Sequence, residues 1–155
     1  MRTKKRLASL VLATAIVMSF GFSVSASNNS DTYYSYYQLP AYTSYVVLTP
    51  GRSKTDTSST YVYFYSTNNA ALNTYGVQYS VHGGSSSSTY VVNCTSYVSS
   101  CIIKPGLKRL IHQNVYELGY TYAFLGLSAP NVQVQGTSPD GLWSPDSTGT
   151  YLYAN

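Results

Sequence analysis

Charged side chains are scarce in this chain. Asp, Glu, Lys and Arg together make up 9% of its 155 residues, and histidine occurs only twice. After the first six residues, the only local cluster of basic side chains is Lys104, Lys108 and Arg109. We interpret this cluster as a solvated rim, because nucleic-acid-binding proteins present a larger basic footprint to phosphates. Beyond the first 26 residues, no apolar run approaches the roughly 20 residues that a membrane-spanning helix needs. These absences argue against a nucleic-acid partner and against a transmembrane segment in the body of the chain.

The first residues have the pattern of an export signal. A positively charged start is followed by an apolar run over residues 7–20 and by the small residues Val24-Ser25-Ala26. This order is typical of a secretory signal peptide. We expect cleavage after Ala26, so that residues 1–26 are the signal peptide and the mature protein is secreted. An uncleaved anchor is the alternative, but the apolar run is short and contains three hydroxyl side chains.

Removal of the signal peptide changes the charge balance. The whole chain has a net charge of +4, but four of its nine Lys and Arg residues lie within residues 1–26. The other 129 residues keep five basic and five acidic side chains, together with all 18 tyrosines. A neutral chain of this length can bury close to two thirds of its unfolded surface in one domain.

Cys94 and Cys101 are the only cysteines. Two cysteines in an exported protein normally pair. We therefore predict a disulfide that closes a short loop, worth about 2.5 kcal/mol. A redox role is the alternative, but redox-active pairs usually have two residues between them. Two cysteines with no histidine close in sequence make a poor zinc site, and we expect no metal and no cofactor.

Alternating apolar and polar residues predict short β-strands through most of the chain. Turn residues separate these segments every 8–12 residues or so, as in sandwiches and barrels. The expected strands cover residues 42–49, 60–66, 75–82, 89–93, 102–103, 121–127, 132–135 and 151–153. The pattern predicts an all-β fold, either an antiparallel β-sandwich or a jelly roll of about eight short strands.

Two regions fit more than one structure. Residues 107–118 suit a helix or a strand, and we favour a strand over 107–112. Residues 27–40 are polar and tyrosine-rich; we expect a flexible N-terminal arm there, with an edge strand as the alternative. The expected organisation is a signal peptide, this arm, and a single β-sandwich domain over residues 41–155.

The chain lacks the patterns of known catalytic sites. The sequence His82-Gly83-Gly84 has the residue types of an esterase oxyanion loop, but no Gly-X-Ser-X-Gly nucleophile elbow accompanies it. His112 lies beside apolar residues. Two acidic pairs have the residue types of a glycosidase: Asp140 with Asp146, and Asp56 with Glu117. Asp140 and Asp146 each follow a proline directly, as is common in turns. Their spacing also matches no known calcium-binding loop. We expect that the protein is not an enzyme.

Aromatic side chains are the remaining candidate for function. A tyrosine has an apolar ring and a polar tip, which suits both stacking on sugars and contacts with proteins. The alternative is that the rings pack in the core and against neighbouring strands, and that Trp143 anchors the C-terminal tail. The candidate surface comprises Tyr61, Tyr63, Tyr65, Tyr120, Tyr122 and Trp143. Low charge and high β-propensity over residues 60–66 also favour self-association through edge strands.

The C-terminal half resembles a group of known proteins. The stretches that carry the resemblance are residues 109–120, Ala123, Leu125 and the tail Gly141-Leu-Trp-Ser-Pro-Asp-Ser147. They are similar to small secreted β-rich proteins of Gram-positive bacteria that have no assigned activity, some of them grouped loosely with lactococcin-type bacteriocins. The resemblance supplies no catalytic residues, and it implies a possible antimicrobial activity. The single tryptophan matches the tryptophan-rich bacteriocins poorly.

These observations favour a secreted, non-enzymatic binding or interaction module at or outside the cell surface. Its partner is unknown and is expected to be a glycan or a protein. A bacteriocin-like secreted antimicrobial effector is the alternative, and a secreted hydrolase is the third hypothesis.

Overall fold

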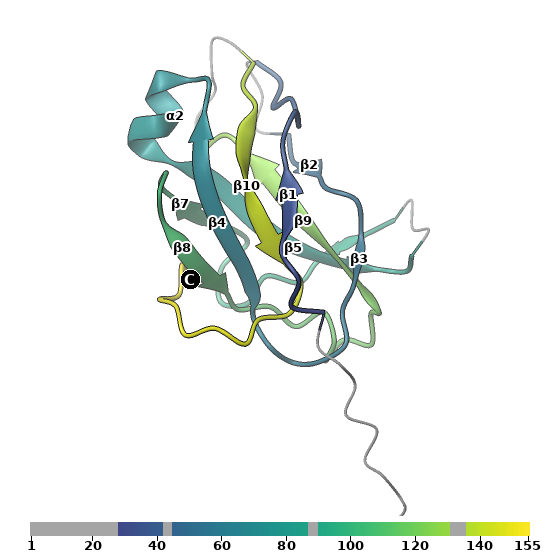
Figure 1. Ribbon diagram of the computed structural model, residues 1–155. Coiled ribbons are helices and arrows are strands. Elements are labelled where there is room, and N and C mark those ends of the chain that lie inside the picture. Colours follow the sequence, from purple (N-terminus) through teal and green to yellow (C-terminus); the bar gives the residue numbers. More distant parts are fainter. Residues whose placement is uncertain (1–27, 42–44, 87–89, 131–135) are drawn as a thin grey trace, which may run out of the picture.

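The computed structural model describes residues 28–41, 45–86, 90–130 and 136–155. The expected signal peptide and the expected strand over residues 132–135 lie outside this part of the chain. The described residues form two antiparallel β-sheets that pack face to face, and this confirms the predicted β-sandwich (Figure 1). Ten strands are present in this part of the chain, where about eight were expected. No helix among the described residues is long and apolar enough to cross a membrane.

The front sheet, nearest the viewer in Figure 1, has four strands. Their order across the sheet is β1 (Thr32–Tyr34), β10 (Pro139–Ser144), β4 (Thr60–Thr67) and β8 (Lys108–Ile111). β4 alternates as its sequence predicts: Val62 and Phe64 are fully buried against the back sheet, and Tyr63 and Tyr65 face outward. The strand β8 also confirms the preference for a strand at the start of residues 107–118.

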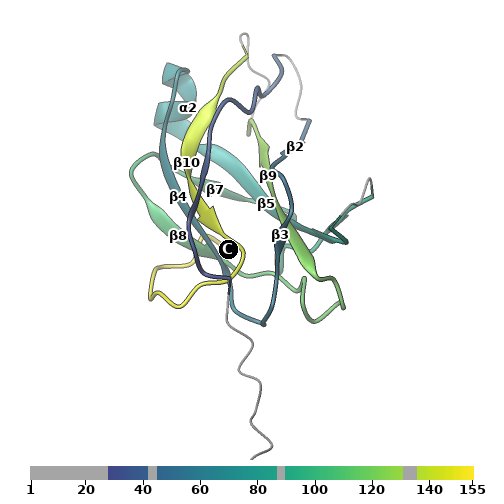
Figure 2. The same ribbon diagram turned by 45° about the vertical axis from the view of Figure 1, so that its right-hand side comes forward.

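The back sheet has six strands around a long central pair. Four of them lie in the order β2 (Val47–Leu48), β9 (Tyr122–Ser128), β5 (Val77–Gly84) and β6 (Val92–Asn93). Two short strands complete the sheet: β3 (Arg52–Ser53) also pairs with β9, and β7 (Cys101–Ile103) also pairs with β5. Figure 2 separates the two layers. Val77, Tyr79 and Val81 are fully buried on the inner face, in agreement with the period-two pattern of this segment.

One short helix, α2 (Ala70–Tyr75), connects β4 to β5 where the sequence predicted only a turn. The Asn69 side chain caps it by accepting hydrogen bonds from the backbone N–H groups of Ala71 and Leu72, at 3.0 and 3.3 Å. Gly76 ends it with a φ of 97°. Tyr75 therefore belongs to the helix, and β5 begins two residues later than expected.

The expected N-terminal arm lies against the sandwich over its described residues. β1 pairs with β10, so the alternative of an edge strand holds. Tyr34 and Leu39 are buried in the core, and Leu39 forms a two-way backbone pair with Thr137. The burial of these two side chains holds the segment on the sandwich, because each removes apolar surface from water.

The end of the chain also differs from expectation. The segment 139–144 looks like a turn, because it begins Pro-Asp-Gly, yet it forms the second strand of the front sheet. Gly141 is required there: a Cβ atom would lie 2.2 Å from the Tyr63 carbonyl oxygen and 2.3 Å from the Tyr34 hydroxyl. The strand expected over residues 151–153 is only an isolated bridge between Tyr153 and Leu110.

The predicted disulfide is absent: Cys94 and Cys101 are both free and buried. Cys101 lies opposite Tyr79 of β5, and its thiol is 3.7 Å from the Tyr79 carbonyl oxygen. The Cys94 sulfur instead lies next to Gly83. A Cβ atom added to this glycine would be 2.9 Å from the Cys94 sulfur. Tyr79 and Gly83 are about 13 Å apart along the strand. The register of the two short strands on β5 therefore separates the sulfurs.

We predict that both thiols resist modification in the folded protein. Burial raises the pKa of Cys94, and it raises the pKa of Cys101 to about 12. The reactive thiolate is therefore scarce at neutral pH, and access is blocked as well. A colorimetric thiol assay without reductant should detect almost no thiol in the native protein and both thiols after unfolding. Failure to detect thiols in the unfolded, unreduced chain would show instead that the two sulfurs are bonded.

Candidate functional site

The outer face of the front sheet carries a row of large side chains. Tyr33, Leu142, Tyr63 and Lys108 occupy directly opposed positions on β1, β10, β4 and β8. Side chains at opposed positions share one face of a sheet. Tyr65 lies two residues beyond Tyr63 on the same face. We call Tyr33, Tyr63, Tyr65 and Leu142 the tyrosine platform.

The rings of the platform contact one another and remain open to solvent. The ring centroids of Tyr63 and Tyr65 are 4.5 Å apart in an edge-to-face arrangement, and those of Tyr33 and Tyr65 are 6.3 Å apart. Tyr33 is 56% exposed and Tyr65 is 37% exposed. The Lys108 ammonium lies 4.9 Å from the centroid of the Tyr63 ring, as in a cation–π contact. The contacts fix the rings in place, while their outer surfaces stay accessible.

A polar cleft of about 330 Å³ lies at the lower end of the platform, and we call it the lower cleft. Its lining combines one carboxylate, one amide, several hydroxyls and two aromatic rings, from Asn29, Asp31, Tyr61, Ser144, Thr148 and Tyr151. The rings of Tyr61 and Tyr151 are 5.0 Å apart. Burial, with a further contribution from Asp31, raises the pKa of Tyr61 to about 12, so its hydroxyl stays a hydrogen-bond donor at neutral pH.

A second cleft, of about 470 Å³, lies at the other end of β4, and we call it the upper cleft. Its lining includes Tyr36, Gln38, Ser66, Asn68, Ser138 and Asp140. The Gln38 amide donates a hydrogen bond of 2.7 Å to the Ser138 hydroxyl. Tyr36 has a φ of 62° and projects almost entirely into solvent.

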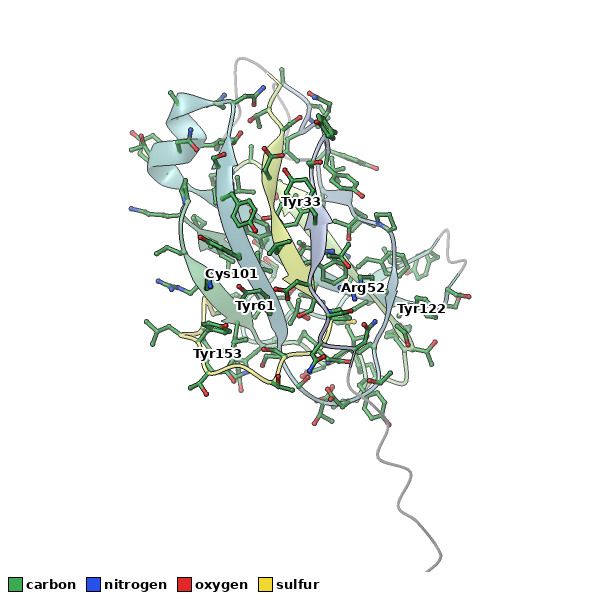
Figure 3. The ribbon with its side chains drawn as sticks, in the orientation of Figure 1. Tyr33, Arg52, Tyr61, Cys101, Tyr122 and Tyr153 are labelled. Carbon is green, nitrogen blue, oxygen red and sulfur yellow. The ribbon has the colours of Figure 1, made fainter. Side chains whose placement is uncertain are left out.

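The two clefts and the platform follow one strand. Tyr61 of β4 lines the lower cleft, Tyr63 and Tyr65 belong to the platform, and Ser66 lines the upper cleft. Figure 3 shows Tyr33 and Tyr61 on this same side of the sheet. The result is a strip with aromatic rings at its centre and hydrogen-bonding groups at both ends.

The structure places Tyr61, Tyr63 and Tyr65, three of the six predicted surface residues, on one face of β4. Tyr61 is only 5% exposed, however, because it packs against Tyr151, so its ring is not presented to solvent as expected. Tyr122 lies elsewhere, at the start of β9, where it pairs with Ser53 and Gly84 (Figure 3). Tyr120 packs its ring on Gly83 of the back sheet. Neither of these two tyrosines belongs to the strip.

Trp143 was placed on the candidate surface, and the structure corrects this. Its side chain is only 1% exposed and lies in the core, because its position on β10 faces inward. The Arg52 guanidinium carbon lies 5.6 Å from its ring centroid, and an Arg52 N–H donates to the Trp143 carbonyl at 3.0 Å. Tyr33, Leu142 and Asp31 were missed, because the segments that carry them look like an arm and a turn in the sequence.

The two histidines and the acidic pair Asp140 and Asp146 do not come together. His82 is hydrogen-bonded to the Ser80 hydroxyl at 2.9 Å, and burial lowers its pKa. His112 stacks on the Tyr153 ring at 3.6 Å. Asp140 lines the upper cleft, whereas Asp146 is buried. Within the described ranges, no group of three or more His, Cys, Asp or Glu side chains is placed to hold a metal ion.

Asp146 forms an ion pair with Lys54 that the sequence did not reveal. Both side chains are 0% exposed. The Lys54 Nζ donates to Asp146 Oδ1 and to the Ser58 carbonyl oxygen, and it lies 3.4 Å from Asp56 Oδ1. The other Asp146 oxygen, Oδ2, accepts hydrogen bonds from Asn28 N–H at 2.8 Å, from Thr55 N–H at 3.3 Å and from the Thr55 hydroxyl at 2.9 Å.

Comparison with curated proteins gives no match, and comparison with solved structures gives none either. A family model does match, over residues 22–147, which include every strand of both sheets and most of the strip. The family is described only as a protein of unknown function, so it assigns no role to the platform or to the clefts. The chain belongs to this family, DUF2712.

Proposed function

We propose that this protein is exported and that its β-sandwich binds a carbohydrate polymer along the strip on the front sheet. The observation that carries the proposal is the tyrosine platform, with exposed rings at its centre and a polar cleft at each end. The rings would stack on the apolar faces of sugar rings. The hydroxyls, amides and carboxylates of the clefts would bind the sugar hydroxyls.

The position of the platform supports this function. Its side chains project from β1, β10 and β4, which form a continuous hydrogen-bonded sheet. A sheet surface holds rings in fixed places, so little conformational entropy is lost when a ligand binds. An extended sugar chain can follow the strip from one cleft to the other, because Tyr61 and Ser66 of the same strand line its two ends.

The charge on the strip favours a neutral polymer over a highly charged one. Asp31 and Asp140 lie in opposite clefts, and Lys108 lies over the platform. No dense field of one sign results, and a strongly anionic or cationic ligand would find little long-range attraction. We therefore expect recognition through stacking and neutral hydrogen bonds, with a weak dependence on salt.

We predict that loss of one platform ring weakens carbohydrate binding. Tyr63→Ala and Tyr65→Ala should each lower affinity about tenfold, equivalent to about 1.4 kcal/mol. Binding is measured by pull-down on insoluble peptidoglycan, chitin and cellulose, followed by calorimetric titration with soluble fragments of the polymer that retains the protein. Tyr90→Ala is the matched control, because Tyr90 is 80% exposed and precedes β6 in the other sheet.

The proposal would be contradicted if none of the three polymers retained the wild-type protein. It would also be contradicted if a polymer retained the wild type, Tyr63→Ala and Tyr65→Ala equally. If the wild type instead captured a protein and no polysaccharide, and Tyr63→Ala abolished that capture, the strip would be a protein-recognition surface. The thermal stability of each variant is measured alongside, so that loss of folding is not mistaken for loss of binding.

The proposed export has a separate test. We expect the protein expressed in a Gram-positive host to accumulate in the medium or on the cell surface, with Ser27 as its N-terminal residue. N-terminal sequencing of the recovered protein checks the cleavage position. Ala26→Asp should retain the longer precursor, because signal peptidases require a small residue there. Full-length chain in the cytoplasm of cells carrying the wild-type gene would contradict the proposed export.

A further inference from the structure

We propose that Lys54 and Asp146 are a covalent cross-linking site, at which the two side chains condense to an amide bond that joins the two sheets. The pair has the right reactants, an amine and a carboxyl group in direct contact, and both are fully shielded from solvent. Lys54 immediately follows β3 of the back sheet, and Asp146 lies two residues beyond β10 of the front sheet. The bond would connect positions 92 residues apart.

Contact and burial both favour this reaction. The condensation requires one proton to pass from the ammonium to the carboxylate, and the Lys54 Nζ already donates a hydrogen bond to Asp146 Oδ1. The product of that transfer is a neutral amine, which is a nucleophile, beside a carboxylic acid. Exclusion of water also opposes hydrolysis of the amide once it has formed.

The geometry assigns a role to each carboxyl oxygen of Asp146. The Lys54 nitrogen attacks the Asp146 Cγ, a C–N bond forms, and the electron pair of the C=O bond moves onto Oδ2. Three donors, the N–H groups of Asn28 and Thr55 and the Thr55 hydroxyl, surround Oδ2 and would stabilise its negative charge. Oδ1, which contacts Lys54, is then the leaving oxygen.

Asp56 is placed to carry the remaining proton. Its Oδ1 lies 3.4 Å from the Lys54 nitrogen, so it can accept a proton from the attacking amine and return it to the departing Oδ1. A backbone N–H from Ser58 donates to the same Asp56 oxygen at 2.8 Å and orients it. Overall, one ammonium and one carboxylate become one amide and one water molecule, and no other reactant is needed.

Intact-mass measurement of the purified wild-type protein tests the proposal. The expected mass is lower than the sequence mass of the recovered chain by one water molecule. After unfolding and digestion, tandem mass spectrometry should show one branched peptide that contains both Lys54 and Asp146. A chain with its full sequence mass, and with Lys54 open to trypsin after unfolding, would overturn the proposal and leave an ion pair.

Two variants locate the chemistry. Lys54→Arg keeps the positive charge but removes the nucleophilic amine, so this variant should have its full sequence mass. A loss of water in Lys54→Arg would place the modification elsewhere and overturn the proposal. Asp56→Asn keeps the size of the side chain but cannot accept the proton, and at least a tenfold larger fraction should remain uncross-linked. Cross-linking of Asp56→Asn to the same extent as the wild type would overturn the role assigned to Asp56. Circular dichroism must show that both variants are folded, because an unfolded chain would keep its full sequence mass whatever the role of Asp56.

Discussion

The alternation of side chains along β4 is the constraint on which the rest of the molecule depends. Because successive side chains of a strand point to opposite faces, Val62 and Phe64 fill the space between the sheets, and Tyr63 and Tyr65 must face outward. A shift of the register by one residue would bury the tyrosines and expose the core. The buried Val62 and Phe64 therefore fix the position of the platform, although they do not belong to it.

The same alternation explains which parts of the fold the sequence could predict. β4, β5 and β9 are long and regular, and their patterns predicted these strands. The pattern also grouped the buried residues of β5 on one face, whereas it left open which face of β4 is buried. The sequence did not predict β10. Its inward-facing residues are Gly141 and Trp143, and these two do not form a recognisable alternation of apolar and polar residues. Gly141 leaves room for the Tyr63 carbonyl oxygen and the Tyr34 ring, which occupy the space that a side chain would need. Tyr34 lies more than a hundred residues from Gly141 in the sequence, so no local sequence pattern can reveal this contact.

The disulfide and the ion pair show the limit of residue-type arguments. Two cysteines in a chain that is expected to be exported favour a disulfide, but here the order of two short strands on β5 separates their sulfurs. Asp146 follows a proline in a turn-like sequence, and nothing local signals that Lys54 meets it in the interior. Burial of a charge depends on the tertiary fold, and removing one partner of such a pair typically costs about 3–5 kcal/mol. An interaction of this kind was thus not visible in the sequence.

The buried pair and the proposed carbohydrate surface are connected through β10. Leu142 of this strand belongs to the platform and Ser144 lines the lower cleft, and Asp146 lies two residues farther along the chain. Ser147 and Thr148, which follow Asp146, line the same cleft. The contact with Lys54 therefore holds the segment that forms one wall of the lower cleft. The surface proposed to bind a polymer gains from this, because every wall residue that is already fixed lowers the entropy lost on binding. Through the segment that follows β10, the interior of the sandwich thus positions part of its outer face.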